Sequence, residues 1–521
     1  MLPAARGIRP VLSKALKFLF YSASTDPEIT RFVDFDSPQK ATAGKSHYEL
    51  FRGWLVFNLL NNNHLVDNSL KYFELSKKFL GLSATERLLK ATVFGQFAGG
   101  LNERECRRVV RKLADAGVSS IWNYSTEKDL DDVDEVRTEA CLAKQDKGFQ
   151  EVTNKYLKCI KMSADCNGDR GLRLAAVKFT PIVNPQLAMK LNGMLVVSQS
   201  VFDQLASKDA VLTDRTISMD TLRKELPALL ERGCLEADSG GVSAVQWNQH
   251  FSIAGNINRF RLLKKKASVS PDVLSLSSLE MKQINGFLDK LDSIGKCARD
   301  HGVRVLVDAE QTYFQRLFDH LVLHHLTPGY NSEGVVIYNT LQAYLKSSME
   351  TLMMSLATAA SYGVHCGIKL VRGAYMKQER QLARSKGHSE TVLPTKQATD
   401  DNYNSCLSHL LEQVPNLDLS VIVGSHNQDS IQLAINKMNE FKLSKTDGRV
   451  AFGQLLGMGD HLTYPLASAG YLVNKVIAYG TLDDVVPFLS RRAQENRSLM
   501  ANADREREIY KLELKRRFSS N

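Results

Sequence analysis

The sequence predicts an α/β protein built on a closed (βα)8 barrel of the TIM type, with a helical region before the barrel and a helical insertion between its second and third strands. Two observations lead to this prediction. From Gly117 onward short apolar runs recur, each followed by polar turn residues and a helix-like segment, which indicates parallel sheet. Eight such runs are present, and that number favours a closed barrel over an open sheet.

The predicted strands end in residues of special interest, because the catalytic groups of such barrels lie at the carboxyl ends of the strands. The eight runs cover residues 118–124, 172–179, 303–309, 334–340, 367–373, 419–425, 448–454 and 471–478.

The chain before the barrel divides into two parts. Residues 1–25 hold four basic residues and no acidic residue before Asp26, with serines flanking an amphipathic core. This composition resembles a mitochondrial transit peptide, although a plain basic N-terminus would share the charge pattern. Residues 26–116 show helical periodicity, including a helix that we expect to be capped at Ser83.

Within the barrel domain, residues 117–500, the stretch 201–266 is too long for an ordinary loop and predicts a helical insertion. Residues 236–247 have a faint calcium-loop outline with Gly241 at the sixth place, but Gly240 and Trp247 stand where oxygen ligands belong. We interpret the insertion as a degenerate EF-hand-like module without metal. After the barrel, residues 501–521 predict a charged, solvated C-terminal tail, with docking to anionic lipid as the alternative.

The bulk composition excludes several classes of function. The net charge of +10 is spread along the chain, without a basic aromatic domain or zinc-finger spacing, so we expect no nucleic-acid partner. The eight cysteines contain no CxxC pair, which predicts reduced thiols. No apolar run reaches the length of a membrane span. The oligomeric state is not indicated.

The residues at the predicted strand ends form a set rich in cations and amides. They are Lys178, Asp308, Glu310, Gln342, Lys369, Arg372, Tyr375, Ser425, His426 and Asn427. After the last strand, Arg491 and Arg492 stand side by side, and paired guanidinium groups suit a carboxylate. On one face of a barrel, these residues predict a site for an anionic substrate and a polar cofactor.

Other catalytic designs find little support. His320, His324 and His325 share one predicted helix, but no HExxH motif accompanies them, so we expect no metal. No GxGxxG, Walker A or GxSxG motif is present. A metal-dependent barrel hydrolase would need further ligands beside His426, and a Ser-His-Asp hydrolase is not required by any spacing.

Five segments in order carry a family resemblance: VDAEQTYFQ (307–315), KLVRGAYMKQER (369–380), VGSHNQDS (423–430), FGQLLGMGD (452–460) and PFLSRRAQENRS (487–498). With IWNYSTEKD (121–129) and VKFTP (177–181), they resemble the mitochondrial proline dehydrogenase, or proline oxidase, family. The resemblance implies a barrel that binds FAD at its strand ends, oxidises L-proline to Δ1-pyrroline-5-carboxylate and passes electrons to ubiquinone. It also implies a peripheral place on the matrix side of the inner mitochondrial membrane.

The resemblance further implies roles for individual residues. Lys178, Arg491 and Arg492 would hold the substrate carboxylate, Asp308 would lie near its amine, and Tyr375 and Leu455 would wall its ring. The cofactor contacts would come from Gln342, Lys369, Val371, Gly373, Thr395, Lys396, Ser425, His426, Asn427 and Glu495.

Three positions depart from the family pattern. Val476 stands where proline-specific members carry tyrosine and a hydroxyproline-oxidising branch carries serine, Phe488 replaces a usual tyrosine, and Asn123 replaces a common aspartate. We therefore keep 4-hydroxyproline as the alternative substrate. A barrel that has lost its flavin and serves as a scaffold or amino-acid sensor is the alternative from another class.

Overall fold

The computed structural model describes residues 33–125, 138–166, 171–207, 212–231, 241–267, 269–387, 389–497 and 500–519, with the backbone alone for 231, 271, 386, 491–497 and 500–503. The elements belong to one compact unit, Asp34–Asn521. The predicted transit peptide, residues 1–25, lies outside the described residues.

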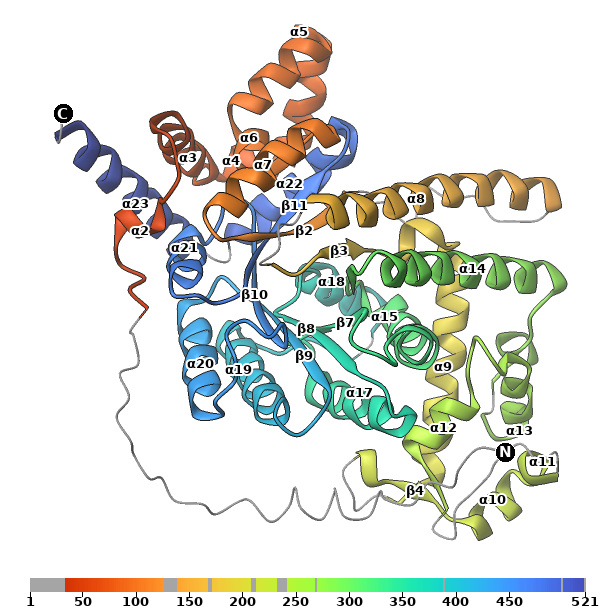
Figure 1. Cartoon of the computed structure of the whole chain (residues 1–521). Coiled ribbons are helices and arrows are strands. Elements are labelled where there is room, and N and C mark those ends of the chain that lie inside the picture. The colour runs from red at the N-terminus through yellow and green to blue at the C-terminus, as the bar shows by residue number, and fades with distance from the viewer. Residues whose placement is uncertain are drawn as a thin grey trace. The chain divides into compact units, whose positions relative to one another are not determined.

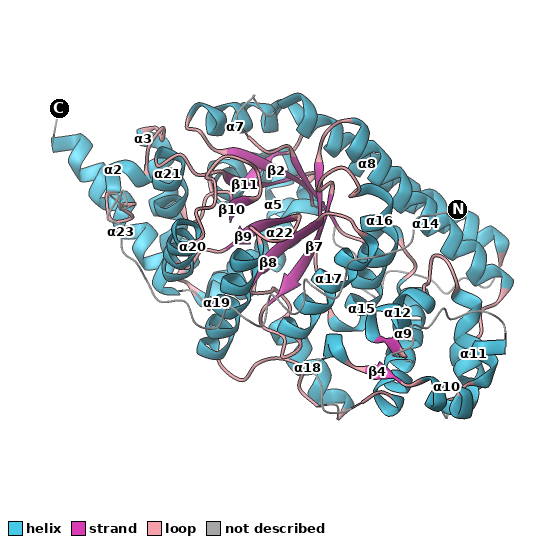
Figure 2. Ribbon diagram, turned by 60° about the horizontal axis from the view of Figure 1, so that its bottom comes forward, coloured by secondary structure: helices cyan, strands magenta, loops and turns pink. Residues whose placement is uncertain are grey.

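Eight parallel strands close into the predicted barrel (Figures 1 and 2). Each strand pairs with the next along the chain, and the pairing of the last with the first completes the ring. The strands are β2 (Ser119–Tyr124), β3 (Leu174–Val177), β6 (Arg304–Val307), β7 (Ile337–Gln342), β8 (Cys366–Val371), β9 (Leu419–Gly424), β10 (Val450–Leu455) and β11 (Val473–Tyr479). All eight predicted strands are confirmed.

Both faces of the strands are buried, which explains why they read as continuous apolar runs. Neighbouring residues of one strand separate to the two sides: Ile121 joins the cluster that fills the barrel, whereas Trp122 packs into the core beneath the helices. Leu306 and Val305 divide in the same way.

Helices surround the strands (Figure 2). Local signals start and end them: Ser277 forms a capping box with Glu280, and Gly363 ends its helix in the left-handed region at φ 66°. They are α8 (Glu139–Cys166), α14 (Ser278–Asp300), α15 (Thr312–Leu321), α16 (Thr327–Tyr330), α17 (Ser348–Tyr362), α18 (Met376–Lys386), α19 (Lys396–Gln413), α20 (Gln428–Glu440), α21 (Asp460–Ser468) and α22 (Leu482–Arg497).

The region before the barrel is helical, as predicted, but it also holds a short strand. Its helices are α2 (Pro38–Ala41), α3 (His47–Leu60), α4 (Asn63–Asp67), α5 (Ser69–Ala91), α6 (Val93–Phe97) and α7 (Glu103–Asp115). Gly81 kinks α5 with φ 76°, two residues before the expected cap at Ser83. The strand β1 (Ala98–Gly100) pairs with Ala478 and Tyr479 of β11. Its three small residues give no apolar period by which sequence could reveal it.

The insertion is mostly helical and includes a two-stranded antiparallel ladder, β4 (Thr216–Ile217) with β5 (Val242–Ser243). Its helices are α10 (Met219–Glu225), α11 (Pro227–Glu231), α12 (Ala244–His250) and α13 (Lys264–Ala267), and α9 (Pro185–Leu205) begins before the insertion and ends within it. Trp247, at the last place of the calcium-loop outline, is fully buried and donates to the Ser198 hydroxyl at 3.0 Å. That position therefore serves packing. Gly240 lies outside the described residues.

The C-terminal segment differs from the solvated tail that its charges predict. It forms α23 (Met500–Ser519), which packs along α3. Tyr510 is fully buried against Leu50 and Phe57, and Glu513 is also buried. Exposed charged residues of α23 are interspersed with buried residues. The overall charge of the segment therefore gave no indication that one face of the helix is packed. No described helix is long and apolar enough to span a membrane.

Candidate active site

The carboxyl ends of β6 and β8 bring opposite charges together. Asp308 directly follows β6, and Lys369 lies on β8 beside Thr340 of β7. The Lys369 ammonium donates to the Asp308 carboxylate, and their side chains are only 15% and 20% exposed. Because water screens such a pair weakly, each charge fixes the position of the other. The barrel mouth thus holds an oriented cation and anion.

A buried carboxylate, Glu310, organises the adjoining loop. It accepts hydrogen bonds from the backbone N–H groups of Phe179 (3.0 Å) and Thr180 (3.1 Å) and from the Thr180 hydroxyl. Burial raises the pKa of Glu310, although the charge of Lys178 acts in the opposite direction. The Glu310 carbonyl accepts from the Gln342 amide at 2.9 Å. Glu310 therefore links two predicted site residues, Lys178 through the charge of its carboxylate and Gln342 through its backbone carbonyl.

Arg372, just past β8, ties three elements together. Its guanidinium donates to Asp400 of α19 (2.6 Å), to Ser425 after β9 (2.9 Å) and to Ser430 of α20 (2.9 Å). It also lies over the Tyr403 ring, 4.2 Å from the centroid. The Ser425 hydroxyl, expected to contact the cofactor, serves here as an acceptor for Arg372.

Thr395 and Lys396, also expected at the cofactor, stand at the start of α19. Thr395 caps the helix by accepting from the backbone of Ala398 at 3.0 Å, and Lys396 donates to Asp400 at 2.6 Å. Burial would raise the pKa of Asp400, but hydrogen bonds from Lys396 and Arg372 outweigh it and lower that pKa. These contacts belong to the helix start, so a cofactor role for either residue stays a prediction.

The end of β9 reaches the end of β10 through a histidine. The His426 Nε2 accepts from the Leu455 N–H at 3.0 Å, so the neutral ring carries its proton on Nδ1. Asn427 caps α20 by accepting from the Ser430 N–H at 3.0 Å. Leu455 lies in register with Val476 of β11. The residue predicted to wall the substrate ring is therefore adjacent to Val476, which departs from the family pattern.

The remaining predicted residues follow β8. Val371 pairs with Gln342, and Tyr375, 5% exposed, stands immediately before α18. Gly373 has φ 122°, and a Cβ atom there would meet the Tyr344 ring at 1.7 Å. Only glycine therefore lets this turn pass so close to Tyr344.

The predicted carboxylate clamp is only partly described. Arg491, Arg492 and Glu495 lie on α22, but their side chains are outside the described residues. Their roles remain predictions.

Comparison with known proteins identifies the family. The sequence model of the proline dehydrogenase family matches residues 106–505. The chain belongs to the proline dehydrogenase family. The prediction made from the five sequence motifs is thereby confirmed.

Relatives from two branches of the family cover almost all of the chain. The human mitochondrial proline dehydrogenase 1 is 31% identical, over 93% of this chain and 90% of its own length. The hydroxyproline dehydrogenase of Xenopus laevis is also 31% identical, over 91% and 88%. That of Rattus norvegicus is 32% identical, over 90% and 91%. Overall identity thus does not separate the two branches.

Solved structures share the fold. The proline utilization A protein of Bdellovibrio bacteriovorus, inactivated by N-propargylglycine, matches with a TM-score of 0.54 and 18% identity. The match covers 88% of this chain and 38% of that one, so this chain spans well under half of the larger protein.

The residues present suit the flavin that the proline dehydrogenase resemblance implies. Lys369 supplies a cation, and Gln342 and Asn427 supply amides, at neighbouring strand ends. Within the described part of the chain, the buried Tyr344 hydroxyl beside Gly373 has no hydrogen-bond partner. A buried hydroxyl without a protein partner is a natural contact for a polar ligand.

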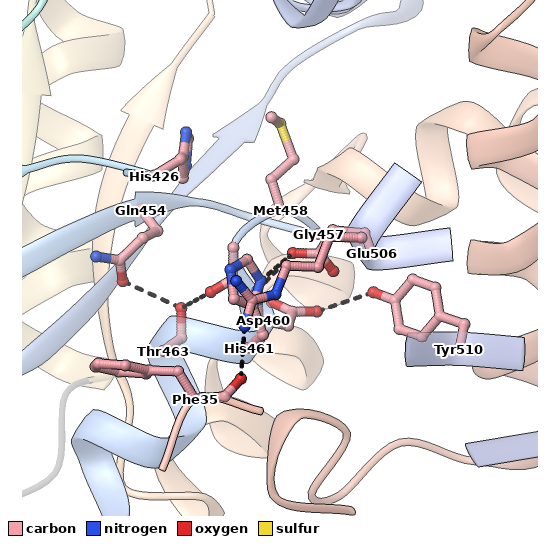
Figure 3. Close-up of polar contacts among 12 residues, drawn as sticks. Phe35, His426, Gln454, Gly457, Met458, Asp460, His461, Thr463, Glu506 and Tyr510 are labelled. Carbon is pink, nitrogen blue, oxygen red and sulfur yellow. Dashed lines mark hydrogen bonds and ion pairs between the residues drawn. The ribbon is translucent and has the colours of Figure 1, made fainter. Parts of the chain in front are cut away.

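A buried charge cluster that no sequence motif indicated lies behind the predicted ring wall. Asp460, at the start of α21, pairs with Lys45 and with Lys475 of β11, both at 2.8 Å, and accepts from the Tyr510 hydroxyl at 3.2 Å. Figure 3 shows Asp460 and Tyr510 facing each other. The Lys475 ammonium also donates to the Leu455 carbonyl at 3.2 Å, which connects the cluster to the predicted ring wall.

A second buried pair joins the same region. His461 lies 3.0 Å from Glu506 of α23, which also accepts from the Asp460 N–H at 3.1 Å (Figure 3). The sequence signal for this cluster was Lys475 within an apolar strand, since a buried cation needs a counter-charge. Its counter-charge Asp460 also pairs with Lys45 and accepts from Tyr510, which lie far away in sequence, so no motif spacing identifies the cluster.

Proposed function

We propose that this chain is a flavin-dependent dehydrogenase that oxidises L-proline to Δ1-pyrroline-5-carboxylate, with FAD at the barrel mouth and ubiquinone as the electron acceptor. The observation that carries the proposal is the family match over residues 106–505, joined to the Lys369–Asp308 pair at the strand ends. The relatives named mitochondrial support a mitochondrial location. A peripheral place on the matrix side of the inner membrane is part of the same proposal.

The chain's own residues would bind and orient the substrate. Arg491 and Arg492, with Lys178, would hold the carboxylate, since a guanidinium matches it with two parallel hydrogen bonds. Asp308, kept in place by Lys369, would accept a hydrogen bond from the ring nitrogen. Tyr375 and Leu455 would pack on the ring and restrict its orientation, which lowers the entropic part of the barrier.

The cofactor would be held by groups from three strand ends and two helices. The strand ends would contribute Gln342, then Lys369 with Val371 and Gly373, then Ser425 with His426 and Asn427, while Thr395 with Lys396 would act from the start of α19 and Glu495 from α22. When bound, the flavin supplies the acceptor for the two electrons released from the carbon beside the ring nitrogen. The substrate loses a hydride from that carbon and a proton from nitrogen.

Val476 favours 4-hydroxyproline as a second candidate substrate. It lies opposite Leu455 and is smaller than the tyrosine of proline-specific relatives, which leaves room for a ring substituent. The relatives from Xenopus laevis and Rattus norvegicus are themselves named hydroxyproline dehydrogenase.

One experiment tests the function and the substrate together. Purified protein is expected to carry a yellow flavin that L-proline bleaches without oxygen, and trans-4-hydroxyproline is expected to bleach it more slowly.

Val476→Ser is expected to raise kcat/KM for hydroxyproline relative to proline by about tenfold, because a hydroxyl partner is added to the wall. Val476→Ala, which removes the same bulk without adding a hydroxyl, is the control. Colourless protein that cannot be reconstituted with FAD would instead support the scaffold or sensor.

A further inference from the structure

A large apolar cavity lies between the N-terminal helices and the barrel. It has a volume of about 370 Å³ and is bounded by α4, α5 and α6, by the end of β10 and by α22. The same helices pack on α22, and Figure 1 shows them beside it. A water molecule occupies about 30 Å³, so the cavity equals roughly a dozen waters and exceeds what a five-membered amino acid needs.

The described lining of the cavity is uncharged and almost wholly apolar. The serine and threonine hydroxyl groups of the lining are already engaged: Ser69 bonds Ser490 at 2.7 Å, Ser76 donates to the Phe73 carbonyl at 2.8 Å, and Thr92 donates to the Leu88 carbonyl at 2.8 Å. Tyr72, which also lines the cavity, is 39% exposed. The walls therefore offer little to water or to a charged ligand, and they suit an apolar one.

The cavity reaches from the predicted substrate wall to the surface. Its inner end is formed by Leu455 and Val476, which lie opposite each other at the ends of β10 and β11. At its outer end Leu65 and Leu88 are 36% and 51% exposed. It is therefore open to solvent at one end and adjacent to the redox site at the other.

The helix at the mouth is unusually apolar on its outside. On α5, Phe79 is 76% exposed and Leu80 is 56% exposed. Exposed apolar patches of this kind mark lipid, ligand or protein contacts. A ligand that enters here would come from an apolar environment.

We propose that this cavity is the binding site for the lipophilic quinone that accepts the electrons. The proposal rests on the proposed proline oxidation and names the place of its second substrate. In the net reaction, proline gives up two electrons and two protons to become the imine, and the quinone takes up two electrons and two protons to become the quinol. The inner end at Leu455 and Val476 brings the quinone ring next to the reduced site, while its apolar chain fills the space under α5.

The test separates quinone binding from proline oxidation. Leu65→Trp narrows the mouth at a partly exposed position, and Val93→Trp fills the middle of the cavity. Leu82→Trp is the matched control, because Leu82 lies on the same surface, is 58% exposed and does not line the cavity. Each variant is assayed as flavoprotein for anaerobic bleaching by proline and for proline-dependent reduction of decylubiquinone.

We expect Leu65→Trp and Val93→Trp to raise the KM for decylubiquinone at least about tenfold, because bulk in an apolar pocket excludes the ligand. Bleaching by proline and the KM of Leu82→Trp should stay at the wild-type values. Without proline, decylubiquinone should raise the Tm of the wild type and of Leu82→Trp by mass action, but not that of the two cavity variants.

Three results would overturn the proposal. The first is an unchanged quinone KM and Tm shift in both cavity variants. The second is slowed bleaching by proline in both, which would make the cavity part of the imino-acid pocket. The third is an equal Tm shift with n-decanol, which would show that any alkyl chain is accepted. If proline fails to bleach the wild type, the proposed function fails, yet the Tm shift still reports on the cavity.

Discussion

At the level of single residues, the pairing of Lys369 with Asp308 determines how the barrel mouth presents its charges. The sequence predicted both as site residues, because Asp308 follows one predicted strand and Lys369 lies on another. It could not predict that they bond directly, since β7 lies between β6 and β8 and the contact across it depends on strand register. The structure adds that both side chains are largely buried, so neither is free to turn into solvent.

Replacing Asp308 by asparagine tests this arrangement. The variant leaves the Lys369 cation with a neutral partner in a poorly hydrated site and removes the negative charge expected beside the substrate nitrogen. We expect kcat/KM for proline to fall by about 100-fold, the scale seen when a positioned electrostatic or proton-transfer group is lost. Steady-state kinetics measure it.

The control for this substitution is Asp401→Asn on the exposed side of α19, where the Asp401 carboxylate accepts from the Gln397 amide at 2.8 Å. Equal kinetics for Asp308→Asn and Asp401→Asn would remove Asp308 from the site.

At the level of elements, the strands were predictable and their ends were less so. Parallel strands covered on both faces give apolar runs that sequence reveals directly. The strand β1 was not predicted, because its residues are alanine and glycine. The strand β3 is shorter than its apolar run, because Lys178 and Phe179 already belong to the following loop. The roles of Ser425 and Asp400 were also hidden, since they depend on Arg372 joining elements that sequence only places in order.

Arg372→Lys tests how the ends of β8 and β9 are held. A lysine retains the charge but cannot reach Asp400, Ser425 and Ser430 together or stack on Tyr403. We expect the free energy of unfolding to fall by about 1–3 kcal/mol, which is the cost of buried hydrogen bonds left unmade. Differential scanning calorimetry of the holoprotein would show a lower Tm, and Arg384→Lys on the exposed face of α18 should leave it unchanged. An unaltered Tm for Arg372→Lys would contradict this role.

At the level of the whole molecule, the Asp460 cluster joins segments from both ends of the chain to the barrel. Lys45 precedes α3, Lys475 lies on β11 and Tyr510 lies on α23. The charged composition of the C-terminal segment predicted a solvated tail, because composition does not show which charges face inward. Here the long-range partners, rather than any local pattern, determine the fold of the segment.

Proton binding to Asp460 couples this cluster to pH. Burial alone would raise the pKa of Asp460, but Lys45 and Lys475 outweigh burial and hold that pKa well below its usual range. A carboxyl whose pKa is depressed in the folded state stabilises the protein above its unfolded pKa of about 3.9. That contribution is present in full at neutral pH and is lost as the pH falls below about 4.

Asp460→Asn should therefore destabilise the protein most at neutral pH. It leaves two buried lysines without a counter-charge, a change that costs about 3–5 kcal/mol, and the difference in Tm from the wild type should shrink as the pH falls below about 4. Asp429→Asn, in the exposed first turn of α20, is the control and should follow the wild type throughout. Because Lys475 also donates to the Leu455 carbonyl, kcat/KM for proline should fall together with stability. A Tm difference that stays constant from pH 7 to pH 3 would show that the charge of Asp460 does not hold the two ends of the chain to the barrel.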